Sequence, residues 1–458
     1  MQEPGVGRGR ISAPIAAIRG AVAAAREDVG ITAGALRIPG QLRRLLLAEG
    51  QSALGDAAAD VGLLLIAYQR LHSPWALSAV LLADRVPRMV LAPLAGVLAD
   101  RVSRRVCLVT ADLLRAAALI GLVLIHSFAF TVVLAGVAGC GTALYRPVVE
   151  ASLPVIARGR DGAARAVTSR WTIIVIGELL GWTLAGLMLL IWPPSGVLLF
   201  DAATFAVSVS ILVRITSLDR PSEETIEGPK EVDGTIKMLL EGARATREIP
   251  GILVLFVTVL SAILAGGLMN VGDPLLAKNV LHSGNAGFGA LKAAIGLGLV
   301  LGTALSGPRG RPVRSMRHSY FRALGIAAVG IAIMAASPSL PIAMVGSVIL
   351  GAGNGLAVAR HLQLIQLTVP EGLIGRINGL LNAAEAGAFV VAFMLGGAAL
   401  ILLGVRETFA ISAVGLLVAA IVGFLRMRRI GDEPELSSVV PPHLQTSTLG
   451  PVDRVPSA

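Results

Sequence analysis

The sequence predicts an all-α integral membrane protein with twelve membrane-spanning helices arranged as two halves of six. Its 458 residues are 55% hydrophobic and only 15% charged, whereas soluble domains carry about 25% charged residues. Twelve apolar stretches follow one another along the chain, and each is about long enough to cross a bilayer. The connectors between them alternate between arginine-rich and arginine-poor, as expected for loops on opposite sides of a membrane.

Short polar connectors bound the spans. In the first half the spans are predicted at about 43–69, 75–98, 106–126, 128–148, 166–191 and 195–216, and in the second at about 251–279, 285–307, 318–336, 340–360, 373–401 and 407–427. Connectors after the second, fourth and eighth spans are rich in arginine, whereas those after the third, fifth and ninth lack lysine and arginine. Arg70 and Arg406 are single exceptions. Because basic loops stay on the cytoplasmic side, we expect a multi-pass protein of the cell membrane, plasma or inner, with both termini cytoplasmic.

Three segments lie outside the spans. Residues 1–42 form a basic cytoplasmic arm, either an amphipathic helix on the inner leaflet or a mobile tail. Residues 218–249 form a charged cytoplasmic linker loop between six-helix bundles at 43–217 and 250–428. Residues 429–458 are rich in proline and serine without apolar periodicity, and are predicted to be a disordered cytoplasmic tail.

One connector carries the most specific motif. Between the second and third spans lie five spaced residues, Gly96, Asp100, Arg101, Arg104 and Arg105. Their spacing resembles the signature of the major facilitator superfamily, G-x-(L/A)-(A/x)-D-R-x-x-R-(R/K), which occupies the same loop. An offset of 211 residues also takes Gly96 to Gly307, Arg165 to Arg376 and Gly186 to Gly397. That offset is in keeping with the parallel six-helix repeats of the family, whose members bind substrate near the midplane between the halves and are expected to be monomers.

In that family the motif has a mechanical role. The resemblance implies that Asp100 lies beside the start of the eleventh span, where free amide groups favour an anion, and that it meets Arg146 at the inner end of the fourth. Such contacts latch the halves together on the inside, and breaking them lets the bundles rock. Further stretches, such as Gly55-Asp56 and Pro370-Glu371, are similar to exporter branches related to the enterobactin exporter and to drug:proton antiporters.

Charged residues inside the first span mark a candidate site, because each costs roughly 3 kcal/mol on membrane-insertion scales. Glu49, Asp56 and Asp60 are seven and four residues apart, so they share one stripe of the helix. They form either a protonatable stripe facing a central cavity or structural ion pairs with arginines of neighbouring helices. A carboxyl group held away from water exchanges its proton closer to neutral pH, which suits proton coupling.

The second and third spans carry acids and arginines together. Arg88 is placed to pair with Asp84 four residues away, whereas Arg85 points elsewhere and needs another partner. Arg85 either binds an anionic group of the substrate or acts on an acid of the first span. Asp112 and Arg115 are a second acid and arginine close together on one helix, nearer the cytoplasmic end of the third span, and we interpret them as structural.

Four charged residues complete the candidate site. Glu178 stands in the fifth span where antiporters of the superfamily typically have proline, and Glu385 lies near the centre of the eleventh span. Both are candidates to line the cavity or to couple protons. Asp273 and Lys292 lie toward the outer side of the second half, where they are a candidate outer gate pair.

Several classes of function are disfavoured. The arginines lie between apolar runs rather than on one basic face, so nucleic-acid binding is not expected. The sequence has no metal-ligand spacing, no nucleophile–base set and no phosphate-binding loop. We therefore expect no catalytic residues, no metal site and no cofactor, with a proton gradient as the energy source.

Three functions remain open. The first is proton-coupled export of small amphipathic molecules such as drugs, by alternating access. The second is export of a metabolite made by the cell, such as a siderophore, for which Arg85 and Arg88 would suit an anionic catecholate. The third is a lipid flippase or a non-transporting sensor of the same fold. The expected partners are a small-molecule substrate and the lipid bilayer.

Overall fold

The computed structural model describes residues 40–157, 160–219, 232–249, 251–306, 313–369 and 371–430. Within these ranges the chain forms thirteen α-helices and no strand. Ten of the helices in this part of the chain are long and apolar enough to cross a membrane. Helices α2 and α3 are as long, but they carry the charged residues noted above. The predicted all-α membrane fold is therefore confirmed, and the most charged spans are the ones that hydropathy marks least clearly.

Each predicted span corresponds to one long helix. The first half contains α2 (Gln41–Leu71), α3 (Pro74–Arg101), α4 (Arg104–Leu124), α5 (Phe128–Ala157), α6 (Arg160–Ile191) and α7 (Pro194–Leu212), followed by the 3-10 turn η1 (Thr216–Asp219). The second contains α9 (Ile252–Leu275), the π-helical turn η2 (Leu276–Val280), α10 (Gly284–Leu305), α11 (Val313–Ala336), α12 (Leu340–Thr368), α13 (Glu371–Leu402) and α14 (Val405–Arg429). Helices α5 and α12 continue well past the predicted ends at 148 and 360, because hydropathy marks the apolar part of a helix and not its polar extension.

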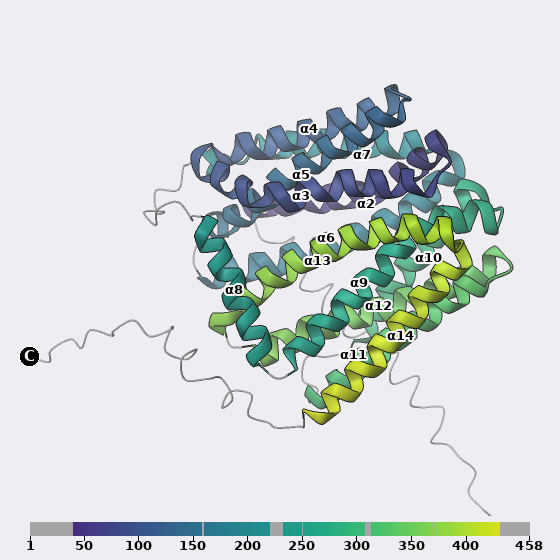
Figure 1. Cartoon of the computed structure of the whole chain (residues 1–458). Helices are drawn as coiled ribbons and strands as arrows, with labels where there is room; N and C mark the ends of the chain where they lie inside the picture. Colours follow the sequence, from purple (N-terminus) through teal and green to yellow (C-terminus); the bar gives the residue numbers. More distant parts are fainter. Residues whose placement is uncertain are drawn as a thin grey trace, which may run out of the picture.

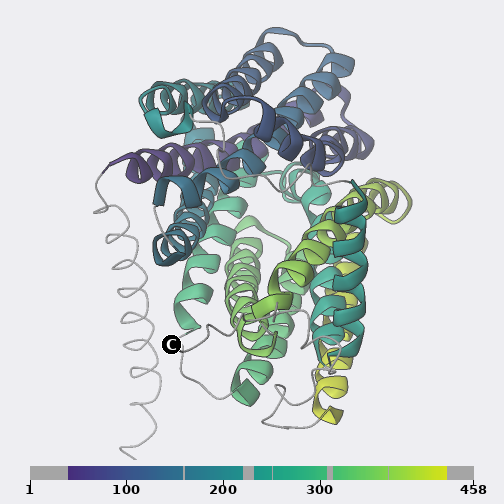
Figure 2. The same ribbon diagram turned by 90° about the vertical axis from the view of Figure 1, so that its left-hand side faces the viewer.

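The twelve long helices form two bundles. In Figure 1 the helices α2–α7 lie in the upper part and α9–α14 in the lower part. The bundles meet on the right of this view and diverge toward the left, where α8 (Val232–Glu248) lies, and Figure 2 looks at them from that diverging side. Contacts between the halves are made chiefly by α3 with α13 and by α6 with α10. The predicted arm up to residue 39 and the predicted tail from residue 431 lie outside the described residues.

The bundles converge at one end, which we call the odd-loop end because it carries the connectors after the odd-numbered spans. These connectors are residues 72–73, 125–127, 192–193, 281–283, 337–339 and 403–404. Near this end the Ser78 hydroxyl donates a hydrogen bond to the backbone carbonyl of Phe393 (2.7 Å). The Tyr68 hydroxyl donates another to Oδ1 of Asn279 (2.9 Å). Both bonds join the first half to the second.

Two glycine contacts at the same end reveal the repeat. Gly186 of α6 packs on the backbone of Gly289 in α10, and Gly397 of α13 packs on Ser78 in α3. A Cβ atom on Gly186 would lie 2.5 Å from the Gly289 carbonyl oxygen, so only glycine allows this approach. The 211-residue offset takes Gly186 to Gly397 and Ser78 to Gly289. The two contacts are therefore equivalent under the pseudo-repeat that the sequence predicts.

The two arginines that break the charge pattern of the loops have a local explanation. Arg70 donates to the Leu122 carbonyl at the end of α4 (2.5 Å) and to the Thr131 hydroxyl. Arg406 donates to the carbonyls of Ala335 (2.9 Å) and Ser337 (2.8 Å) at the end of α11. The last carbonyls of a helix lack intrahelical donors and carry partial negative charge. Each arginine therefore caps a neighbouring helix of its own half.

Helix α8 occupies about half of the segment predicted as a linker loop. Its buried residues follow the i, i+3, i+4, i+7 spacing of an amphipathic helix, ending at Ile249 just beyond it: Gly242, Ala245, Thr246 and Ile249. This stripe packs on α13, where the Arg376 guanidinium forms an ion pair with Glu241 (3.2 Å). The high charge of the segment hid the short apolar stripe. The linker is therefore docked on the second half over these residues.

Candidate functional site

Charged side chains from five helices of the first half gather around the middle of α2. They come from α2 (Asp56 and Asp60), α3 (Asp84, Arg85 and Arg88), α4 (Asp112 and Arg115), α5 (Arg146) and α6 (Glu178). Most of them were candidates from the sequence. We call this set the central cluster.

Asp56 and Asp60 are the accessible acids of α2. Their side chains are 43% and 45% exposed, whereas residues 57–59 and 61–62 beside them are buried. Helix α2 is packed by α6, α7, α3 and α5 of its own half, so it is enclosed on its other sides. The open stripe faces the second half, because the Arg85 guanidinium that pairs with Asp60 also lies 5.8 Å from the Phe389 ring on α13.

Asp56 is held by Arg115, an almost fully buried arginine of α4. One guanidinium nitrogen lies 3.4 Å from the Asp56 carboxylate, and another forms a close ion pair with Asp112. The rings of Tyr145 and Phe205 flank the guanidinium at 4.6 and 4.2 Å from its carbon, a cation–π arrangement. Asp112 and Arg115, interpreted from the sequence as structural, thus also position a cation against an accessible acid.

Asp60 is linked to a ladder of charges on α3. Arg88 pairs with Asp84 across one helical turn at 2.5 Å, as the spacing predicts. Arg85 lies 3.5 Å from Asp84 and 3.7 Å from Asp60, so its second partner is the first-span acid. Gly139 of α5 packs directly on the backbone carbonyl of Asp84, which brings α5 close to this ladder.

Arg146 and Glu178 face the same region from α5 and α6. Arg146 is exposed, and the charges that act on it come from Arg88, Arg85, Glu178 and Asp56. It therefore belongs to the central cluster in this conformation. Glu178 is half-buried, and Arg146, Asp60 and Asp56 act on it. The two glycines that flank Glu178, at 177 and 181, pack on the backbone of α2, which explains how α6 approaches so closely.

The predicted conformational-switch motif is described only in part. Helix α3 extends through Gly96 and Asp100 to Arg101, but the side chains of residues 92–101 lie outside the described part of the structure. The predicted contact between Asp100 and Arg146 therefore stays a prediction. Arg104 is buried, and Arg105 donates a hydrogen bond to the Ile215 carbonyl at the end of the first half (2.8 Å).

Glu49 occupies a different environment from the other two acids of its stripe. It is 5% exposed and forms a 2.7 Å ion pair with Nε of Arg170 on α6. Another nitrogen of the same guanidinium lies 3.4 Å from Glu150 on α5. This geometry matches the structural alternative considered for the stripe, an acid neutralised by an arginine of a neighbouring helix.

Replacing Glu49 with glutamine is expected to destabilise the protein by about 3 kcal/mol, because it leaves the Arg170 charge buried without its closest partner. Thermal unfolding of the purified protein in detergent measures the effect. Removing both charges together, as Glu49→Leu with Arg170→Leu, should recover much of the loss. An unchanged melting temperature for Glu49→Gln, combined with an altered pH dependence of transport, would instead assign Glu49 to proton coupling.

The candidate residues of the second half are not brought into the central cluster. Asp273 and Lys292 form an ion pair (2.6 Å), and Lys292 also donates to Asn270 (3.1 Å). Both partners belong to the second half, on α9 and α10, so this pair does not itself join the halves. Glu385 is half-buried on α13, one turn before Phe389, and forms no ion pair with the described residues.

One buried acid was not among the residues predicted from the sequence. Asp201 of α7 is 1% exposed and accepts a hydrogen bond from the Thr204 hydroxyl (2.9 Å). It packs against Gly55, next to Asp56, and the charges of Asp56, Arg115 and Asp60 act on it. A lone aspartate inside the apolar stretch 195–216 was the signal that could have found it.

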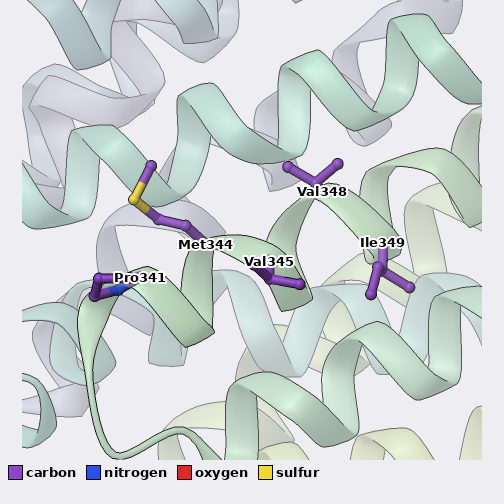
Figure 3. Close-up of a pocket in the computed structure, with 5 residues that line it drawn as sticks. All are labelled: Pro341, Met344, Val345, Val348 and Ile349. Carbon is purple, nitrogen blue, oxygen red and sulfur yellow. The ribbon is translucent and has the colours of Figure 1, made fainter.

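A shallow hollow on α12 lies away from these charges. Figure 3 shows that only apolar side chains line it: Pro341, Met344, Val345, Val348 and Ile349. They follow one face of the helix and offer no charge or hydrogen-bonding side chain. Such a surface suits lipid acyl chains, so the central cluster remains the better candidate. Among the described residues no group of histidine, cysteine, aspartate or glutamate is arranged to hold a metal ion.

Comparison with known proteins agrees with the architecture. The sequence profile of the Major Facilitator Superfamily matches residues 46–392. The chain is 24% identical over 395 residues to the uncharacterized MFS-type transporter YfiS of Bacillus subtilis (strain 168), covering 83% of this chain and 92% of that protein. It is 27% identical over 290 residues to the enterobactin exporter EntS of Escherichia coli O1:K1, covering 60% of this chain and 65% of EntS.

A solved structure shows the same fold. The nucleoside transporter NupG superposes with a TM-score of 0.65 at 12% identity, covering 85% of this chain and all of that one (100%). At this level of identity the likeness concerns the arrangement of helices and not the substrate.

Proposed function

The chain belongs to the major facilitator superfamily, and from this premise we propose that it is a secondary active transporter that couples proton movement to the export of small amphipathic molecules. The observation that carries the proposal is the pair of accessible carboxylates, Asp56 and Asp60, each within 4 Å of an arginine at mid-helix. Charged groups inside membrane helices are rare, and they commonly mark substrate or proton pathways.

The ion pairs supply a coupling mechanism. While Asp56 and Asp60 are ionised, they attract Arg115 and Arg85 at distances of 3.4 and 3.7 Å. Protonation of a carboxylate removes that attraction and frees the guanidinium to move or to accept another anion. An ionised carboxylate and an anionic group of the substrate therefore compete for the same arginines, which links the protonation state of Asp56 and Asp60 to substrate binding.

The conformation supplies the second requirement of alternating access. The described hydrogen bonds Tyr68–Asn279 and Ser78–Phe393 join the halves near the odd-loop end, which the charge pattern predicts to face the outside of the cell. In this proposed orientation, the end where the bundles meet would face the outside and the end where they diverge would face the cytoplasm (Figure 1). Substrate would enter the diverging side, and rocking of the bundles about the central cluster would expose it to the outside.

A second candidate is export of a metabolite that the cell makes itself, such as a siderophore. The relatives named as enterobactin exporters favour it, because one of them matches over 60% of this chain. Both candidates use the same cluster and the same cycle. They differ in the chemistry of the substrate and in its source.

Inverted membrane vesicles test the proposal. With the protein present, an inside-acid pH gradient is expected to drive uptake of an exported compound severalfold above vesicles without it, and a proton ionophore should abolish the difference. Candidate compounds come from two screens of a deletion strain, one for sensitivity to toxic molecules and one for metabolites that accumulate in the cells. Uptake that is equally fast without a pH gradient would contradict proton coupling.

A further inference from the structure

Arg146 is the accessible cation of the central cluster that has no ion pair with the described residues. It is exposed on α5, and no carboxylate of the described residues lies within 4 Å of its guanidinium. Arg85, Arg88 and Arg115 each have at least one such partner. Four guanidinium groups therefore share this region, and three of them are already neutralised.

Arg146 lies near charges of the other helices of the first half. The charges that act on it belong to α2, α3 and α6, the helices that surround the central cluster. Its exposure therefore measures access from the space between the halves. A guanidinium at this position can be reached by a molecule that enters where the bundles diverge.

The charge of Arg146 determines which class of molecule can bind beside it. A guanidinium remains charged at any physiological pH, whereas a carboxyl group can become neutral by taking up a proton. Glu178, which forms no ion pair with the described residues, can therefore become neutral by taking up a proton, whereas Arg146 stays charged. An accessible guanidinium without an ion-pair partner among the described residues can form charge-assisted hydrogen bonds with an anionic group of a ligand.

The rest of the wall defines the other part of the ligand. The Phe389 ring lies 5.8 Å from the Arg85 guanidinium and 5.7 Å from the ring of Phe393, whose backbone carbonyl accepts the Ser78 hydrogen bond near the odd-loop end. An aromatic surface beside the guanidinium of Arg85 suits a molecule that has both an acidic group and an apolar or aromatic body.

We propose that Arg146 is the residue that binds the substrate's acidic group, and that the transported molecules are small amphipathic anions. The proposal rests on the proposed function in one respect, since it takes the central cluster to be the transport site. It makes Arg146 a specificity-determining residue, with Asp56 and Asp60 left to carry protons.

Binding to the purified full-length protein in detergent tests this without any gradient. The probes share one aromatic body and differ only in charge: 1-naphthoate, 1-naphthylmethylammonium and neutral 1-naphthamide. The wild-type protein is expected to bind the anion at least about 10-fold more tightly than the other two, as a charge-assisted hydrogen bond to guanidinium allows. Arg146→Gln should abolish that preference, and Arg146→Lys should retain part of it.

The matched control is Arg322→Gln, which removes an exposed arginine from α11 in the second half. It should leave the preference for the anion unchanged. The proposal is overturned if the wild-type protein shows no preference for the anion, or if Arg146→Gln keeps it. Because binding requires no proton gradient, failure of proton coupling would leave this result intact, and the two proposals can be judged separately.

Discussion

Replacing Asp56 and Asp60 together with asparagine is expected to abolish transport driven by a pH gradient. Asparagine has almost the same shape as aspartate but cannot carry a proton. Neither substitution strands a buried cation, because Arg115 keeps Asp112 and Arg85 keeps Asp84. The double variant should therefore fold, and only the coupling of transport to protons should be lost.

Two assays separate coupling from binding. In inverted vesicles, gradient-driven uptake by the double variant should fall to the level of vesicles without the protein. Exchange of labelled for unlabelled substrate across the membrane at equal pH should persist, since it needs no net proton movement. The control is Glu407→Gln, which neutralises an exposed acid at the odd-loop end. Gradient-driven uptake that survives in the double variant would remove these acids from the mechanism.

Replacing Gly186 with leucine is expected to force the halves apart at the odd-loop end. The new Cβ alone would lie 2.5 Å from the Gly289 carbonyl oxygen, which belongs to the backbone and cannot turn aside. Overpacking of this kind costs about 1–3 kcal/mol, so the ratio of open to closed molecules at this end should rise by about 5- to 160-fold. Gly397→Leu should do the same, because the repeat offset places it at the equivalent contact with Ser78.

Pulsed electron paramagnetic resonance between spin labels measures this opening. Labels at Ser73 and Leu403 report the separation of the two halves in a background without Cys107 and Cys140. Gly186→Leu should add a population at longer distance. The matched control is Gly325→Leu, where a Cβ atom would meet nothing within 4 Å. A distance distribution identical to that of the parent protein would show that the α6–α10 contact does not hold the odd-loop end closed.

Hydropathy and charge alone could predict the course of the chain through the membrane. Every predicted span has its helix, because burial in lipid demands long apolar runs whatever the tertiary contacts. Helix α8 was not predicted, because its buried stripe of four residues at Gly242–Ile249 is short and its surroundings are charged. The pseudo-repeat was visible in three glycine and arginine coincidences, and its meaning became clear only from the Gly186 and Gly397 contacts.

The sequence could predict which residues belong to the candidate site better than it could predict which of them form ion pairs. A charge in an apolar span is conspicuous in sequence, so Asp56, Asp60 and Arg85 were evident. Which partner neutralises each charge depends on how helices pack, and packing is set by glycines such as Gly139 and Gly141, where Arg115 passes across α5. Helical spacing put Glu49 on the same stripe as Asp56, yet the approach of α6 pairs it with Arg170. Asp273 and Lys292 likewise pair within one half.

Labelling of a single cysteine at position 60 measures from which side of the membrane a reagent can reach the central cluster. Asp60→Cys, in the background without Cys107 and Cys140, is treated with a membrane-impermeant maleimide from the cytoplasmic side or from the outside. We expect reaction from the cytoplasmic side in this background, and reaction from the outside once Gly186→Leu is added. Reaction from neither side, or from the same single side in both proteins, would contradict a site that opens in turn to the two faces of the membrane.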